Sequence, residues 1–471
     1  MQVLEQFKRT LEAMTIEQIR QGIIGRFQPY ETPFGVQSMV YADYVASGRA
    51  LMQIEHFLIE QVLPFYANAH TEASETGQFI TRLREAARAE IADAMALGSD
   101  ASVIFCGAGA TAGLQRLVAL LQISDRVRDG ETVTVLVGPY EHHSNMLPWR
   151  ESGAQVIEIA EQQGGGVDVD DLQQKLATHR NGFTVVALSA ASNVTGVICQ
   201  SAALTRMVKQ AGALMVWDYA GGAPYLEMTL GEADAIVYSP HKMLGGVGAS
   251  GVLAVKHAVC HSQKPTAAGG GTVRFVSPWA HDYIPSLVHR EEAGTPNAIG
   301  DIRAALAMIV KRSIGLDYIF EQDKALAERG QAHFAGISNL SLLGQSLSVP
   351  RLPFFAFQVN DHQDQRVHHQ LFTRILSDAY GVQARGGCAC AGSYAHRLLG
   401  IDRAASDALR ARILAGDEMA KPGWVRLNLS YVHDEAEVQM ILNALSDAAE
   451  KIDEWVKHYE HDPKTARFKA A

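Results

Sequence analysis

Lys242 has neighbours that suit covalent chemistry. It follows an apolar, strand-like run in the segment VYSPHKMLGGVG, with Ser239 and His241 close by and several glycines after it. An amine becomes a nucleophile when partial burial lowers its pKa, and the serine and histidine are donors for a phosphate group. The glycines let the backbone approach a ligand closely. A lone lysine is most often an ordinary exposed side chain, but this setting favours a ligand site at the end of a strand.

Three segments upstream carry residues that suit the same site. Asp218 ends the apolar run LMVWD, where a buried carboxylate needs a cation such as a protonated pyridine nitrogen; capping of the next turn is the alternative. Glycines and Thr111 open a helix in GAGATAGLQRLVAL, and the N-terminus of a helix binds phosphate through free amide groups. In YEHHSNMLPW, His142 or His143 can stack on a planar ring and transfer protons, although two surface histidines fit equally well.

Seven apolar runs between residues 100 and 256 must position these side chains. They alternate with amphipathic segments of helical spacing, which predicts a mostly parallel sheet covered by helices on both faces. Ligands of such sheets bind at the carboxyl ends of the strands, where the residues above lie. The expected strands are Ser102–Gly107, Thr132–Gly138, Gln155–Ile159, Phe183–Ser189, Leu214–Tyr219, Ala235–Ser239 and Gly251–Val255.

The C-terminal part of the chain has a different pattern, which predicts a smaller α+β domain. We expect an N-terminal extension at residues 1–40 that starts with an amphipathic helix, a large α/β domain at 41–300 and the small domain at 301–471. A polar, loop-like insertion is expected at 401–423. The small domain should contain a long helix from about Ile302 to Phe334, a strand at FFAFQV, a helix near Val367–Tyr380, a strand at Trp424–Leu429 and a closing helix at Glu435–Trp455.

Charge, hydropathy and cysteine content exclude several classes of protein. The chain has 41 Lys and Arg residues and 51 Asp and Glu residues, which gives a net charge of −10. It has no long basic run that could neutralise the phosphates of a nucleic acid or a membrane. No apolar run reaches the roughly 18 residues of a membrane helix, and no secretory signal is recognisable. Five cysteines in 471 residues do not make a disulfide scaffold. We expect a cytoplasmic protein without a nucleic-acid or membrane partner, and no metal site, since no Cys or His cluster supplies four ligands.

The ordered motifs EHHSNMLPW, SNVTGV, WDYAGG, SPHKMLGGVG, GGGTV, EEAGTPN and RGGCAC resemble class V of the fold-type I pyridoxal-phosphate (PLP) enzymes. Within that class the chain is most similar to the group-II cysteine desulfurases, also called selenocysteine lyases. The resemblance runs from about Tyr41 to about Leu445 and is more specific for the superfamily than for the reaction. It implies PLP as the cofactor and a mostly parallel seven-stranded sheet with a smaller C-terminal α+β domain.

The resemblance implies a role for each matching residue. Lys242 resembles the lysine that forms a Schiff base with PLP, Asp218 the partner of the pyridinium nitrogen, and His142 the residue that stacks on the ring. Arg426, in WVRLNLSYV, resembles the arginine that binds the substrate carboxylate, a bidentate task that suits a planar guanidinium. Thr272, in GGGTV, resembles a residue contributed by the neighbouring protomer, which implies a homodimer. Other matches are the phosphate ligands Ser239, His241 and Thr111, the phosphate-turn position Ala110, and Asn193, which resembles a residue near the cofactor hydroxyl and the substrate.

The type of reaction depends on a thiol. In group-II desulfurases the sulfur-accepting cysteine closes an R-x-G-x-x-C pattern, which residues 385–390 match, so the resemblance assigns this role to Cys390. A persulfide-forming cysteine must be accessible and partly thiolate, and a glycine-rich loop beside Arg385 suits it. Cys388 is a second thiol two residues away. A buried structural pair, a reversible Cys388–Cys390 disulfide and half a metal site are the alternatives.

The resulting hypothesis is sulfur transfer from L-cysteine to Cys390, with alanine as the other product and a sulfur-acceptor protein as a further partner. The alternative is a class V aminotransferase, lyase or epimerase acting on another amino acid, which needs Lys242 but no thiol. A PLP-binding scaffold without turnover is disfavoured, because the lysine, aspartate, histidine and arginine of the site are all present.

Several positions depart from the family pattern or match it without a clear task. Gly221 stands where the pattern D-x-A-Q has a glutamine that bonds the cofactor phenolate. Ala112 and Ala110 stand where the phosphate-binding turn has a glutamate and a threonine. Asn68 and His70 match a loop that lines the entrance of the site, or form a polar loop with no catalytic task.

Overall fold

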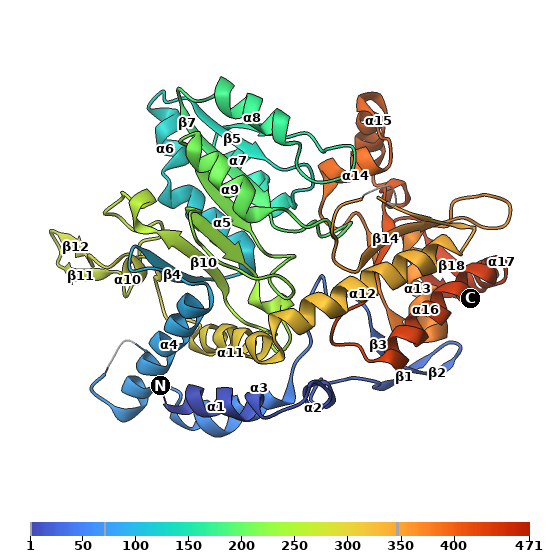
Figure 1. Cartoon of the computed structure of the whole chain (residues 1–471), viewed down its shortest axis with the longest axis horizontal. Coiled ribbons are helices and arrows are strands. Elements are labelled where there is room, and N and C mark those ends of the chain that lie inside the picture. The colour runs from blue at the N-terminus through green and yellow to red at the C-terminus, as the bar shows by residue number, and fades with distance from the viewer. Residues whose placement is uncertain (1, 70–71, 345–347) are drawn as a thin grey trace.

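A seven-stranded sheet forms the centre of the larger part of the protein (Figure 1). The computed structural model describes residues 2–69, 72–344 and 348–471, so His70 lies outside the described residues. The strands are β4 (Ala101–Cys106), β5 (Val133–Val137), β6 (Gln155–Glu158), β7 (Phe183–Ser189), β8 (Leu214–Asp218), β9 (Ala235–Tyr238) and β10 (Gly251–Lys256). Their order is β4-β10-β9-β8-β7-β5-β6, and β10 runs in the opposite direction to the other six strands. The predicted mostly parallel α/β sheet is confirmed.

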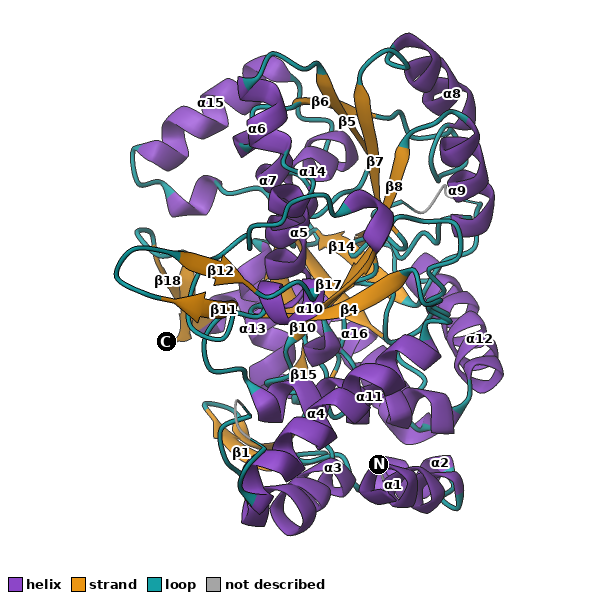
Figure 2. Ribbon diagram, turned by 90° about the vertical axis from the view of Figure 1, so that its left-hand side faces the viewer, coloured by secondary structure: helices purple, strands orange, loops and turns teal. Residues whose placement is uncertain are grey.

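Helices cover both faces of this sheet. They are α5 (Gly109–Leu120), α6 (Ile123–Arg128), α7 (Leu147–Glu151), α8 (Val169–Thr178) and α9 (Ser201–Gln210). Successive side chains of a strand point to opposite faces. On β7, Val186 and Leu188 therefore pack in one core cluster with α8 and α9, whereas Val185 and Ala187 pack in another with α5 and α7. Figure 2 shows these two pairs of helices on opposite sides of the strands. Burial on both faces explains why the strands are nearly continuous apolar runs.

The N-terminal segment packs against the larger part of the protein. The helix expected there is present: Leu4, Phe7 and Leu11 lie on one face and are buried in the main core cluster. No helix among the described residues combines the length and apolarity that a membrane crossing requires. The elements of this region are α1 (Gln2–Glu12), α2 (Ile16–Gln21), the hairpin of β1 (Pro29–Thr32) and β2 (Gly35–Ser38), β3 (Val40–Tyr41), α3 (Met52–Phe57) and α4 (Glu75–Ala94).

A second sheet of four strands organises the C-terminal region, and all its pairs are antiparallel. Its order is β13 (Leu340–Leu342), β14 (Phe354–Val359), β17 (Trp424–Asn428) and β16 (Arg385–Gly387). Helices α13 (His369–Tyr380) and α16 (Glu435–Glu450) share a core cluster with it. The strands expected at FFAFQV and near Trp424 and the helix near Val367–Tyr380 are confirmed, whereas the closing helix ends at Glu450, five residues before the expected Trp455. Strand β15 (Val382–Gln383) pairs with β3. Two hairpins are formed by β11 (Val273–Val276) with β12 (His281–Tyr283) and by β18 (Tyr459–Asp462) with β19 (Arg467–Ala470). The remaining helices are α10 (Leu287–Glu291), α14 (Gly392–Leu398) and α17 (Ile452–Trp455).

Two other expectations for this region are wrong. The long helix is two helices, α11 (Ala298–Ile314) and α12 (Leu316–Ala335), which break at Gly315 because its φ of 92° lies outside helical space. In Figure 1, α12 runs from the large sheet to the small one. The segment expected as a loop contains the helix α15 (Arg403–Leu414), whose N-cap Asp402 accepts a hydrogen bond from the amide of Ala405. None of its residues is buried, so an apolar period that would have marked the helix is missing from its sequence.

Candidate active site

A cavity of about 220 Å³ lies at the carboxyl ends of β7, β8 and β9. The first turn of α5 and the turn after β5 complete its wall, so distant parts of the chain meet at one edge of the sheet. Eight of the predicted site residues line this cavity, namely Ala110, Thr111, His142, Asn193, Asp218, Ser239, His241 and Lys242.

Lys242 ends a short 3₁₀ turn, Pro240–Lys242, that follows β9 directly. Removal of the ammonium group from water lowers the pKa of Lys242 to about 8, although the nearby carboxylate of Asp218 works in the opposite direction. No described residue makes a hydrogen bond or an ion pair with its side-chain amine. A substantial fraction of this amine is therefore neutral at mildly alkaline pH, and it faces the cavity.

Asp218 is the last residue of β8 and is 3% exposed. One of its carboxylate oxygens accepts a hydrogen bond from the amide of Ala220 at 2.7 Å. Burial raises the pKa of Asp218, and the positive charge of Lys242 offsets only part of that shift. A buried carboxylate at the wall of a cavity is stabilised by a cationic group bound in that cavity.

His142 is fixed as a neutral imidazole. Its Nδ1 accepts a hydrogen bond from the backbone amide of Ser144 at 3.1 Å and lies 3.0 Å from the Ser144 hydroxyl. An amide nitrogen only donates, so Nδ1 is unprotonated and the ring proton is assigned to Nε2. Burial, and then the charge of Lys242, lower the pKa of His142 to about 4. The ring therefore stays uncharged at neutral pH.

Donors for an anionic group gather where α5 begins. The amide of Ala110 donates to the Ser239 hydroxyl at 2.9 Å, and the Thr111 hydroxyl lies 2.7 Å from that of Ser144. Gly109 has a φ of +61°, and a Cβ there would lie 2.6 Å from the Ser239 oxygen. The turn is therefore restricted to glycine. A phosphate at this helix N-terminus would meet hydroxyls and free amides.

The residues of the cavity fit PLP. Asn193 supplies a specific observation: its Oδ1 is buried and has no hydrogen-bond partner among the described residues. Such an orphaned acceptor costs free energy unless a ligand donor reaches it, as the hydroxyl of PLP would. The amine of Lys242 suits the aldehyde, the carboxylate of Asp218 suits the ring nitrogen, and the N-terminus of α5 suits the phosphate.

Residues 40–441 match the family described as aminotransferase class-V. The chain belongs to this family. The class-V resemblance is thereby confirmed, and PLP is the cofactor of the enzyme. Among curated relatives, a probable cysteine desulfurase of Halalkalibacterium halodurans is 27% identical over 360 residues, 75% of this chain and 84% of the relative. A cysteine desulfurase of an Enterobacter strain is 28% identical over 359 residues, 75% and 84% of the two chains.

Solved structures show the same class-V fold. An apo cysteine desulfurase of Thermococcus onnurineus aligns with a TM-score of 0.75 at 24% identity, over 93% of this chain and 99% of that one. A cysteine desulfurase of Escherichia coli gives a TM-score of 0.72 at 22% identity, with the same coverage. The predicted fold-type I architecture is confirmed by these alignments.

Three of the predicted site residues of this class-V enzyme do not line the cavity. Arg426, on β17, lies beside it: its Nη1 donates to the backbone carbonyl of Asn193 at 2.9 Å. Thr272 is buried elsewhere, and its hydroxyl donates to the Gly269 carbonyl at 2.7 Å. Cys390 is exposed, in a loop between β16 and α14.

The loop that carries Cys390 is nevertheless bonded to the rim of the cavity. The side-chain amide of Asn193 donates to the carbonyl of Ala389 at 2.8 Å. The backbone amide of His143 donates to the carbonyl of Cys390 at 2.9 Å, and the ring of His143 accepts from the amide of Gly392 at 3.0 Å. Three hydrogen bonds thus hold the thiol-bearing loop at the site.

Sequence reasoning missed Asp43 and Glu141, which do not line the cavity but bond residues at or beside it. Asp43 bonds Arg426 at 3.0 Å and Arg385 at 2.9 Å. Glu141 is 1% exposed and accepts from the amide and the hydroxyl of Ser189 at 2.8 and 2.6 Å. Burial raises the pKa of Glu141 to about 7, and these hydrogen bonds limit the shift. The available signal was local: each acid stands just after a strand, where an unpaired charge is costly.

One departure from the family pattern affects the cavity wall. Gly221 lines the cavity, and a Cβ at this position would lie 3.3 Å from the carbonyl of Ala191. No side chain at this position reaches the cofactor, so Asn193 is left as the lining amide side chain on this part of the wall. Ala112 is half-buried in the first turn of α5 and adds no polar group.

Proposed function

We propose that this protein is a cysteine desulfurase, which moves the sulfur of L-cysteine onto Cys390 and releases L-alanine. The observation that carries the proposal is the anchored loop: an exposed thiol is held by Asn193 and His143, which border the PLP cavity. An aminotransferase or epimerase has no need for a thiol in this position. The names of the relatives agree with the proposal.

Arg426 binds the substrate carboxylate in this proposal. Its Nε is buried and has no hydrogen-bond partner among the described residues, whereas Nη1 and Nη2 are bonded to Asn193 and Asp43. An oxygen of a substrate carboxylate would satisfy Nε. Asp43 fixes the direction of the guanidinium and limits the net positive charge of the pocket, so that binding remains reversible.

Bound PLP supplies an aldehyde for covalent attachment of the substrate and a ring that accepts an electron pair. Asp218 holds the proton of the ring nitrogen, because this buried carboxylate is stabilised by a neighbouring cation. Lys242, neutral in part near pH 8, takes the proton from Cα of the substrate. His142 remains neutral and presents its Nε2 proton to the cavity.

The sulfur transfer exchanges a C–S bond of the substrate for an S–S bond of the enzyme. The thiolate of Cys390 attacks the substrate sulfur, an S–S bond forms and the C–S bond of the substrate breaks. The carbon that lost sulfur gains a proton, which gives alanine and an enzyme persulfide. No external oxidant is needed, since the substrate supplies both the sulfur and the oxidising equivalent. The exposure of Cys390 leaves the persulfide open to an acceptor thiol or protein.

Paired variants of the two thiols test the proposal. Cys390→Ser should abolish sulfide release and alanine formation from L-cysteine while keeping the visible absorbance of bound PLP. Cys388→Ser, the matched control, should keep both products, because Cys388 is only half exposed and is not the end of the R-x-G-x-x-C pattern. Retention of full alanine formation by Cys390→Ser would contradict the proposal and favour thiol-independent chemistry on an amino acid.

We also propose that the enzyme works as a homodimer. The hairpin of β11 and β12 exposes Phe275, Val276 and Trp279, which are 54%, 62% and 90% exposed. Apolar side chains gathered on one hairpin indicate a surface that another chain covers. Thr272 immediately precedes this hairpin and does not line the cavity of its own chain, which supports a role for it at the site of the partner.

A further inference from the structure

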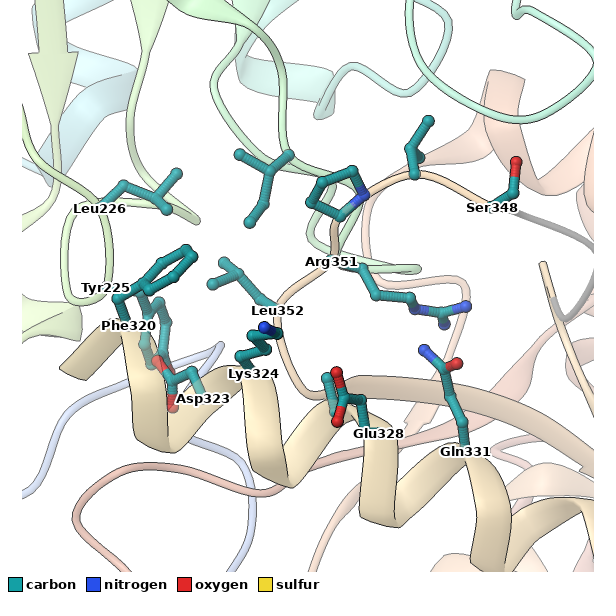
Figure 3. Close-up of a pocket in the computed structure, with 14 residues that line it drawn as sticks. Tyr225, Leu226, Phe320, Asp323, Lys324, Glu328, Gln331, Ser348, Arg351 and Leu352 are labelled. Carbon is teal, nitrogen blue, oxygen red and sulfur yellow. The ribbon is translucent and has the colours of Figure 1, made fainter. Parts of the chain in front are cut away.

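A second and larger cavity, of about 530 Å³, shares no lining residue with the cavity that contains Lys242. One wall is the face of α12 that carries Ala327 and Gln331, and the opposite wall is the segment 348–352 (Figure 3). Apolar side chains such as Leu226 and Leu352 line its middle. This size is typical of pockets that bind small molecules.

Arg351 is a buried cation in this cavity without a matching anion. The side chain is 8% exposed, and its Nη1 donates to the carbonyl of Gly344 at 3.1 Å. Its Nε and Nη2 have no hydrogen-bond partner among the described residues, and no described carboxylate forms an ion pair with the guanidinium. These two groups form the edge of a guanidinium that binds both oxygens of a carboxylate. A buried cation without an anion is unfavourable, and a bound carboxylate would compensate it.

The backbone holds Arg351 in place. It forms a β-bridge with Val197, and the amide of Leu352 donates to the carbonyl of Gly196 at 2.8 Å. These two backbone interactions fix the segment that carries the guanidinium. In Figure 3 the side-chain amide of Gln331 points toward this guanidinium across the cavity.

Two acids line this cavity, the buried Asp323 and the exposed Glu328, and neither forms an ion pair with Arg351. Glu328 lies one helical turn from Lys324, an exposed cation that lines the same cavity. Asp323 is 3% exposed, and one of its oxygens accepts from the amide of Tyr431 at 3.1 Å. Its other oxygen and the hydroxyl of Tyr225 are buried without a partner among the described residues. Burial raises the pKa of Asp323 well above its ordinary value, which favours the uncharged acid in this cavity. Asp323 and Gln331 lie eight residues apart on α12, roughly 12 Å along its axis.

We infer that this cavity is a second ligand site, which takes a small carboxylic acid with an apolar body, the carboxylate on the Nε/Nη2 edge of Arg351. The apolar body lies between α12 and Leu352, toward Asp323. This site is separate from the PLP cavity, and its occupation does not depend on the reaction that the enzyme catalyses.

Calorimetric titration of the PLP-loaded enzyme with octanoate tests the inference. We expect Arg351→Gln to weaken octanoate binding by at least about tenfold, the loss that follows when a charge-assisted bidentate pair is removed. Gln331→Glu should weaken it similarly, because the new carboxylate occupies the guanidinium edge, and this variant should unfold at no lower temperature than the wild type. Octan-1-ol, which has no carboxylate, should bind the wild type at least about tenfold more weakly than octanoate does.

Arg410→Gln, on the exposed helix α15, is the matched control and should bind octanoate as the wild type does. Because Arg426 is also a proposed carboxylate site, the Arg351 and Gln331 variants decide the outcome. Equal octanoate affinity in the wild type and both variants would overturn the inference. Absence of octanoate binding to the wild type at millimolar concentration, or equal binding of octan-1-ol, would overturn it as well.

Discussion

Replacement of Lys242 by methionine should stabilise the apoprotein at neutral pH by an amount that follows from the burial of its amine. The pKa of Lys242 is lowered from 10.5 to about 8, chiefly because the cavity wall removes water from the ammonium group. Each pKa unit corresponds to about 1.4 kcal/mol, so the charged amine costs the folded state about 3 kcal/mol. Methionine has a similar length and carries no charge.

The sign of the pH dependence follows from proton binding. Below pH 8 the amine is charged in both states, and the folded state bears the full cost. Between pH 8 and 10.5 the unfolded chain binds more protons than the folded one, so the stability of the wild type rises with pH. Lys242→Met should therefore be more stable by about 3 kcal/mol at pH 7, and this gain should shrink as the pH approaches 10.5.

Urea unfolding of PLP-free wild type and Lys242→Met, measured at a series of pH values from 7 to 10, checks this expectation. Lys421→Met is the control, since the amine of Lys421 is half exposed and pairs with Glu418 on the surface. A gain for Lys242→Met that stays constant across this range, or no gain at pH 7, would refute the reasoning.

Two further changes are expected to have defined costs. Asp43→Asn removes the carboxylate that pairs with the buried guanidinium of Arg426, and should lower the free energy of unfolding by about 3–5 kcal/mol. Glu435→Gln, which breaks the exposed pair with Arg329, should leave the urea midpoint almost unchanged in the same assay, and equal costs for the two variants would contradict the assignment. Gly315→Ala should cost about 1–3 kcal/mol, because a φ of 92° is strained for any residue with a Cβ; an unchanged unfolding midpoint would argue against this strain.

Much of the candidate site follows from the sequence because of a property of parallel sheets. Asp218 and Lys242 each stand at or just after the end of an apolar strand, and the carboxyl ends of parallel strands share one edge. Local patterns of burial therefore suffice to bring these side chains, and those at the start of α5, into one cavity. The helix α15 was not predicted for the opposite reason: none of its residues is buried, so its sequence has no apolar residues at helical spacing.

The partners of buried charges were decided only by the tertiary structure. Asp43 meets Arg426 from 383 positions away, because the amide of Asn428 at the end of β17 donates to the carbonyl of Ala42 and holds this segment beside β17. The docking of the Cys390 loop on Asn193 and the unmatched guanidinium of Arg351 likewise depend on contacts between separate layers. A sequence indicates whether a position is buried through its composition and the spacing of its apolar residues. It does not record which distant group compensates a buried charge, since that depends on how the sheets and helices pack.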